Sequence, residues 1–151
     1  MKLFKQYRFG FVFLGLLLFL LVMLPNFIWF AVPAPNDILR TESVTPVMDV
    51  IASVCQVLTV ASLCFLISEE RGKLRFSPLV IATVFCVSAY YLGWILYYVG
   101  ITNPWVILLL TIPPCLSFIL FAADQKNLPA VLFATAFAVC HLIFGVVNFI
   151  I

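Results

Sequence analysis

The stretch FGFVFLGLLLFLLVMLPNFIWFAV, residues 9–32, contains no charged side chain. A helix needs about 20 apolar residues to cross the hydrocarbon core of a bilayer, so this stretch is long enough to do so. Four more stretches of the same kind follow, at residues 47–67, 78–99, 105–123 and 128–151. Inside a membrane only helices and closed barrels satisfy all their backbone hydrogen bonds. The sequence therefore predicts an all-α, polytopic transmembrane helical bundle with five spans.

The composition is typical of one transmembrane domain covering residues 1–151. Hydrophobic residues make up 66% of the chain and charged residues 9%, with a mean hydropathy of +1.24. In soluble domains about a quarter of the residues are charged. The only formally charged residue within the five stretches is Asp49. The net charge of +2 is too small to indicate a nucleic-acid partner, and the expected surroundings are the lipid bilayer.

The distribution of basic residues predicts the orientation. Arg40 follows the first span, and the other seven basic residues fall in segments expected on the opposite side of the membrane: Lys2, Lys5, Arg8, Arg71, Lys73, Arg75 and Lys126. Lys and Arg are enriched in the cytoplasmic segments of membrane proteins. We therefore expect a multi-pass protein of the cell membrane, with its N-terminus in the cytoplasm and its C-terminus outside.

The first span also resembles a secretory signal, because basic residues precede an apolar run. The apolar region of a signal is about 7–15 residues long, whereas this run continues to Val32. Pro33 and Pro35 then crowd the small residues at which cleavage would occur. A retained signal-anchor helix is the preferred interpretation.

Prolines mark both the starts and the interiors of the predicted helices. A capping side chain precedes a first-turn proline four times, at Thr45, Ser77, Asn103 and Asn127. Such a side chain accepts a hydrogen bond from a first-turn N–H, and proline has no N–H to leave unpaired there. Internal prolines, which kink a helix, are Pro25 in the first span and Pro113 and Pro114 in the fourth. A kinked helix either lines a cavity or merely fits the bundle, and both alternatives stay open.

Polar side chains are predicted to gather in the middle and outer half of the bundle. With a rise of 1.5 Å per residue, Gln56 and His141 lie at mid-membrane, and Asp49 and Asn148 about 10–12 Å further out. Asn26 falls between these levels, and the third span adds aromatic side chains to its outer half. This pattern favours a pocket that opens outward. Its candidate ligand-binding residues are Asn26, Asp49, Gln56, Tyr90, Trp94, Tyr97, His141 and Asn148.

Helical spacing indicates that these side chains point into the bundle. Asp49, Ser53 and Gln56 are spaced i, i+4, i+7 and share a helix face. On the fifth span small residues share a stripe with the polar ones, which indicates a close interface between helices; the stripe is Ala130, Ala134, Ala138, His141, Gly145 and Asn148. We therefore expect Gln56 and His141 on facing helices, within reach of a direct or water-bridged hydrogen bond.

Each polar residue also has a purely structural interpretation. Asp49 lies one turn into its helix, where the helix dipole stabilises a carboxylate. Gln56 and a neutral His141 can serve as hydrogen-bonding links between helices, and Asn148 can belong to a frayed terminus. Intramembrane ionisable groups are nevertheless functional candidates by default. His141 is therefore the strongest candidate for a functional residue.

The sequence predicts no catalytic residue, metal site or cofactor, and an enzymatic function is disfavoured. One histidine cannot provide both axial ligands of a haem or a multi-histidine metal site. Neither G-x-S-x-G nor H-E-x-x-H occurs. The cysteines lie inside the spans without a C-x-x-C spacing, so packing is favoured over a thiolate cluster; they are Cys55, Cys64, Cys86, Cys115 and Cys140.

Four motifs resemble uncharacterised small five-span bacterial integral membrane proteins. They are PN at 25–26, AYYLGWILYY at 89–98, GITNPW at 100–105 with IPP at 112–114, and AVCH at 138–141. The resemblance implies the bacterial inner membrane and no particular activity.

Two functions stay open on the sequence. The first is ligand binding or transport through an outward-facing intramembrane polar pocket; a transporter of this size would form a homo-oligomer or join a partner membrane protein. The alternative is an accessory or structural subunit that packs against another membrane protein. A water-filled pocket for a small-molecule ligand would favour the first function, and a dry interior the second.

Overall fold

Five long helices and a small two-stranded sheet make up the computed structural model, which describes residues 6–72 and 76–151. In chain order the elements are β1 (Tyr7–Phe9), α1 (Phe13–Ala31), the 3₁₀ turn η2 (Ile38–Arg40), α2 (Pro46–Phe65), β2 (Leu66–Ser68), α3 (Pro78–Tyr98), α4 (Pro104–Asp124) and α5 (Leu128–Phe149). All five α-helices are long and apolar enough to cross a membrane. The predicted all-helical fold with five candidate spans is confirmed, and the chain fits an integral membrane protein.

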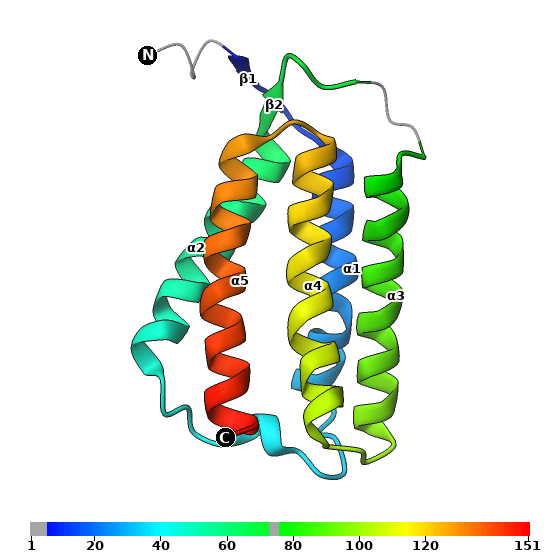
Figure 1. Cartoon of the computed structure of the whole chain (residues 1–151), viewed down its shortest axis with the longest axis vertical. Helices are drawn as coiled ribbons and strands as arrows, with labels where there is room; N and C mark the ends of the chain where they lie inside the picture. The colour runs from blue at the N-terminus through cyan, green and yellow to red at the C-terminus, as the bar shows by residue number, and fades with distance from the viewer. Residues whose placement is uncertain (1–5, 73–75) are drawn as a thin grey trace.

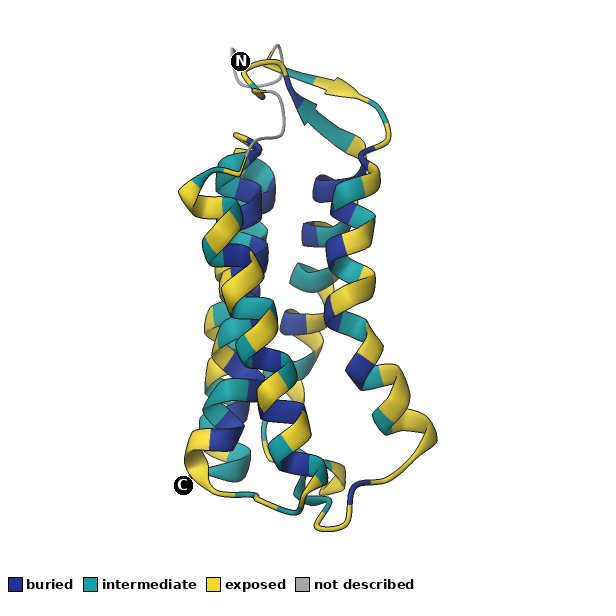
Figure 2. Ribbon diagram, turned by 90° about the vertical axis from the view of Figure 1, so that its right-hand side faces the viewer, coloured by how far each residue is buried: buried dark blue, intermediate teal, exposed yellow. Residues whose placement is uncertain are grey.

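Successive helices run antiparallel, and α4 is the central one. Figure 1 shows α3, α4 and α5 side by side, with α1 behind α4. α4 packs extensively against both α3 and α5 and is buried over most of its length, unlike the other four helices. α2 packs mainly against α5, and its Pro46 end diverges from the bundle (Figure 1). Exposed residues run along the helices (Figure 2), and many of them are large apolar residues, which suits contact with lipid.

The two ends of the bundle differ in their connections. One, here called the hairpin end, carries β1, β2 and the tight α4–α5 turn; the other, the loop end, carries the α1–α2 loop of residues 32–45, the α3–α4 turn and the C-terminus (Figure 1). Arg8, Arg71 and Lys126 lie at the hairpin end and Arg40 at the loop end. The remaining basic residues lie outside the described residues; they are Lys2, Lys5, Lys73 and Arg75.

The first two helices are shorter than predicted. α1 begins at Phe13 and not at Phe9, and α2 ends at Phe65 and not at Ile67. The residues left over pair with each other, because β1 and β2 form an antiparallel ladder. The bounds of the other three helices agree with the prediction to within two residues.

This pairing continues past the ladder and caps the end of α2. The Val12 N–H donates to the Cys64 carbonyl at 2.8 Å, and the Gly10 N–H donates to the Phe65 carbonyl at 3.0 Å. The last carbonyls of a helix have no donor inside the helix. The extended segment before α1 supplies those donors, which is why it does not join the helix.

Three of the four predicted helix caps are confirmed. The side chains of Ser77, Asn103 and Asn127 each accept a hydrogen bond at 3.1 Å from the N–H three residues further on. The prediction for Thr45 is wrong, since its side chain caps nothing. Its hydroxyl instead accepts a hydrogen bond from Asn148 at 2.8 Å, which ties the start of α2 to the end of α5.

The small-residue stripe of α5 is a close helix interface, as predicted. Ala130 and Ala134 are fully buried. A Cβ added at Gly145 would lie 2.8 Å from the Thr111 hydroxyl of α4, closer than side chains normally approach. The small residues therefore let α5 pack directly onto the central helix.

A side chain of a neighbouring helix replaces the backbone hydrogen bond that Pro25 removes from α1. Pro25 has no N–H, so the Leu21 carbonyl loses its helical donor. The Tyr91 hydroxyl of α3 donates to that carbonyl at 2.8 Å. Lipid offers no replacement donor, so Tyr91 stabilises the kink.

We predict that Tyr91→Phe lowers the free energy of unfolding by about 1 kcal/mol, the usual contribution of one hydrogen bond. In a Pro25→Ala background the helix regains its own donor for Leu21, and the same substitution should cost much less. Unfolding of the four proteins in detergent measures this coupling. An equal loss of unfolding free energy in both backgrounds would contradict the inference that Tyr91 replaces the missing donor.

Candidate functional site

A cavity of about 410 Å³ lies toward the loop end, and all five helices contribute to its wall. This volume is within the range of small-molecule pockets. Most of the wall is apolar and includes eight aromatic residues: Trp29, Phe30, Tyr90, Trp94, Phe118, Phe137, Phe144 and Phe149. Polar groups interrupt it at Asn26, Asp49, Ser53, Gln56, Thr111 and His141.

The structure brings six of the eight candidate residues together around this cavity. They are Asn26, Asp49, Gln56, Tyr90, Trp94 and His141. Tyr97 and Asn148 are not part of the wall and have other partners. The rise per residue and the helical spacing, both read from the sequence, thus predicted most of the polar side chains in this wall.

On the side of the wall formed by α1 and α3, three polar side chains lie together, and their hydrogen-bonding groups are only partly paired. The Asn26 amide donates to the Tyr90 hydroxyl at 2.7 Å and to the Val22 carbonyl at 3.1 Å. Trp94 lies edge-on to Tyr90 and is 6% exposed. Its N–H approaches the Tyr90 hydroxyl without meeting hydrogen-bond geometry, and finds no acceptor among the described residues. An unpaired buried donor costs about 1–3 kcal/mol, and the atom is shielded from water by its neighbours.

Gln56 and His141 lie on packed helices and line the same cavity, and no direct hydrogen bond joins these two side chains. Of the predicted direct or water-bridged contact, the water-bridged form stays a prediction. The Gln56 amide instead donates to the Met23 sulfur at 3.9 Å. The imidazole is stacked between Phe137 and Phe144, with ring centroids 5.1 and 5.9 Å away. Both rings belong to α5, four residues before and three residues after His141, so this stack follows from helical spacing within one helix.

Asn148 is ordered and connects to the cavity through Thr45. Its side-chain oxygen accepts from the Val44 N–H at 2.7 Å, and its amide donates to the Thr45 hydroxyl. That hydroxyl donates in turn to one oxygen of Asp49 at 3.3 Å. The chain of contacts excludes the frayed-terminus interpretation of Asn148 and positions Asp49.

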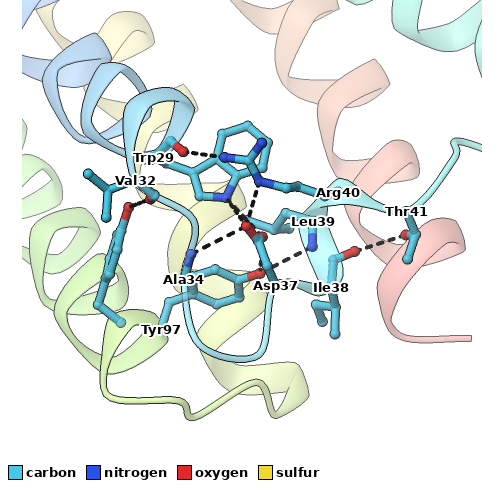
Figure 3. A network of polar contacts seen from close by, with 10 residues as sticks. Trp29, Val32, Ala34, Asp37, Ile38, Leu39, Arg40, Thr41 and Tyr97 are labelled. Carbon is cyan, nitrogen blue, oxygen red and sulfur yellow. Dashed lines mark hydrogen bonds and ion pairs between the residues drawn. The ribbon is translucent and has the colours of Figure 1, made fainter.

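The loop end is closed by a set of contacts around Asp37, shown in Figure 3. The carboxylate accepts hydrogen bonds from the Trp29 indole at 2.9 and 3.0 Å, from Arg40 Nε at 2.7 Å and from the Tyr97 hydroxyl at 2.9 Å. We call these four residues the loop clasp. Leu39 donates its N–H to Tyr97 at 3.1 Å and lines the cavity. The clasp therefore positions part of the cavity wall.

Arg40 holds the clasp to α1 in two ways. Its guanidinium donates to the Trp29 carbonyl at 2.6 Å and lies 4.8 Å from the centroid of the Trp29 ring. The first contact satisfies a carbonyl at the end of α1, and the second is a cation–π interaction.

The sequence analysis missed the loop clasp and assigned Tyr97 to the pocket. One signal was present: Asp37 and Arg40 are opposite charges three residues apart in a chain with few charges. Their partners Trp29 and Tyr97 are far away in sequence, and only the fold brings them together.

No known protein family, curated protein or solved structure matches this chain. Within the described ranges no group of three or more His, Cys, Asp or Glu residues could hold a metal ion, and all five cysteines are free. The chemistry of the cavity is therefore hydrogen bonding, aromatic contact and the single carboxylate of Asp49.

The clasp also fixes the ionisation of Asp37. Burial alone would raise the pKa of this carboxyl, which is 11% exposed. The hydrogen bonds from Trp29, Arg40 and Tyr97 outweigh burial and hold the pKa below its ordinary value. A lowered pKa means that the folded state binds the proton less tightly than the unfolded state, so the clasp stabilises the fold only while Asp37 is ionised.

We predict that Asp37→Asn lowers stability by about 2 kcal/mol at neutral pH, as expected for hydrogen bonds to a charged group. The stability difference between the variant and the wild type should have its full size above the ordinary aspartate pKa of about 4. It should fall to zero as the pH drops through the lowered pKa of Asp37 in the folded protein. Thermal unfolding in detergent between pH 7 and pH 2.5 measures it. Glu42→Gln, in the same loop but exposed, is the control with little effect. A difference that stays constant or grows on acidification would contradict this assignment.

Proposed function

We propose that this protein binds a small molecule in the intramembrane cavity, as a ligand-binding protein or as a transporter. One observation carries the proposal: an apolar cavity of about 410 Å³ has polar side chains from α1, α2, α3 and α5 in its wall. Protein interiors are close-packed and their buried polar groups are normally paired. A helix bundle that served only as a packing subunit would not need this space.

We further propose that the hairpin end faces the cytoplasm and the loop end faces outside, in a bacterial inner membrane. The support is the distribution of basic residues, with Arg8, Arg71 and Lys126 at one end and Arg40 at the other. In this orientation the cavity lies in the outer half of the bundle. A transporter of 151 residues would act as a homo-oligomer or with a partner membrane protein.

Single cysteines at exposed positions of the two ends test the orientation. We expect Glu42→Cys to react with a membrane-impermeant thiol reagent in intact cells, and Gly72→Cys to react only after the membrane is opened. Both positions are exposed. The five native cysteines lie in the helices, and labelling of the wild type sets the background. The opposite pattern would reverse the orientation.

A matched pair of serines tests whether the cavity holds water. Ser53 lines the cavity and Ser88 does not. Both are exposed residues within helices, and each hydroxyl donates to the carbonyl four residues earlier, at 2.8 and 2.9 Å. We expect Ser53→Cys to react with a water-soluble, impermeant thiol reagent and Ser88→Cys, which faces lipid, to remain unlabelled.

The reaction of Ser53→Cys should occur from outside, and unfolding of each variant in detergent confirms that its fold is intact. An unreactive Ser53→Cys in a folded protein means a dry interior. That result would contradict ligand binding and favour the accessory subunit, for which the interior serves packing alone.

A further inference from the structure

We propose that the ligand of the cavity is an organic cation and that Asp49 is its counter-ion. The inference rests on the proposed function and names the ligand class of the same site. Its basis is a carboxylate without a cationic partner in a wall made largely of aromatic rings.

The charge in the cavity wall is of one sign. Of the residues that the structure describes, Asp49 is the only acidic one that lines the cavity, and no Lys or Arg among them does. Within residues 6–72 and 76–151 the one ion pair joins Arg40 to Asp37. A carboxylate within a transmembrane helix normally has a partner, because leaving its charge uncompensated away from water is costly. Asp49 is half-exposed in the first turn of α2, and no cationic side chain among the described residues pairs with it.

One oxygen of this carboxylate remains free for a ligand. Oδ1 accepts the hydrogen bond from Thr45, and no donor to Oδ2 is present among the described residues. Asn148 fixes Thr45 from the other side at 2.8 Å. The protein thus orients the carboxylate through one oxygen without neutralising it.

Aromatic rings stand at the same level of the bundle as Asp49. Asp49 lies in the first turn of α2, at the loop end, while Trp29 and Phe30 lie in the last turn of α1 and Trp94 lies about one turn from the end of α3. All four line the cavity. The faces of aromatic rings attract cations, most strongly when water is excluded, and quaternary ammonium groups are recognised in this way.

The chain already contains this combination in a filled form. At the same end of the bundle the Arg40 guanidinium lies over the Trp29 ring and pairs with Asp37. Asp49 presents a carboxylate and aromatic rings without the internal cation. A ligand with a positively charged group and an apolar or aromatic body would provide the missing partner and fill the apolar part of the cavity.

The experiment uses a pair of water-soluble probes of matched shape and opposite charge, benzyltrimethylammonium and benzylsulfonate. Binding to the purified full-length protein in an uncharged detergent is measured by equilibrium dialysis. We expect saturable binding of the cation and no saturable binding of the anion. Asp49→Asn should weaken cation binding about 30-fold or more, because a buried charge loses its partner. Glu42→Gln, an exposed acidic residue at the same end of the bundle, should leave binding unchanged.

The outcomes separate this inference from the proposed function. Equal binding of both probes, or full cation binding by a folded Asp49→Asn variant, overturns the inference. No saturable cation binding, in a protein whose Ser53→Cys variant is labelled from water, also overturns it but leaves the small-molecule pocket in place. An unlabelled Ser53→Cys overturns both. If Asp49→Asn fails to fold, the two probes on the wild-type protein decide, because their comparison requires no substitution.

Discussion

Every backbone polar group inside the bilayer must find a partner within the protein, and several polar side chains of this chain serve that requirement. The Tyr91 hydroxyl donates to the Leu21 carbonyl that Pro25 leaves unpaired. Asn127 caps α5 and also donates to the carbonyls of Ser62 and Leu66 at 2.8 and 2.9 Å, where α2 ends. Helix ends and kinks, where backbone bonds are missing, are thus the places at which distant segments are joined.

This constraint identifies the residues that have a different role. Several polar side chains that are not needed by the backbone line one cavity, among them Asn26, Gln56 and His141. Polar groups are costly in a low-dielectric interior unless they are paired. Their presence in this wall is the basis of the proposed ligand binding.

The two acidic residues at the loop end show how differently one chemical group is used. Asp37 is saturated with hydrogen bonds and paired with Arg40, so it fastens the α1–α2 loop and the start of the cavity wall. Asp49 is oriented through Thr45 and has no cationic partner among the described residues. The first carboxylate stabilises the fold, and the second is the proposed counter-ion of a ligand.

The sequence by itself determined the five apolar helices, three of their caps and the gathering of Asn26, Asp49, Gln56 and His141 in one part of the bundle, because hydropathy, helix rise and helical phase are local properties. Tertiary structure decided the rest. The residues before α1 pair with those after α2, and Tyr97 holds the loop instead of lining the cavity. These choices depend on which donor, acceptor or ring a distant segment brings within a few ångströms, and no spacing along the chain contains that information.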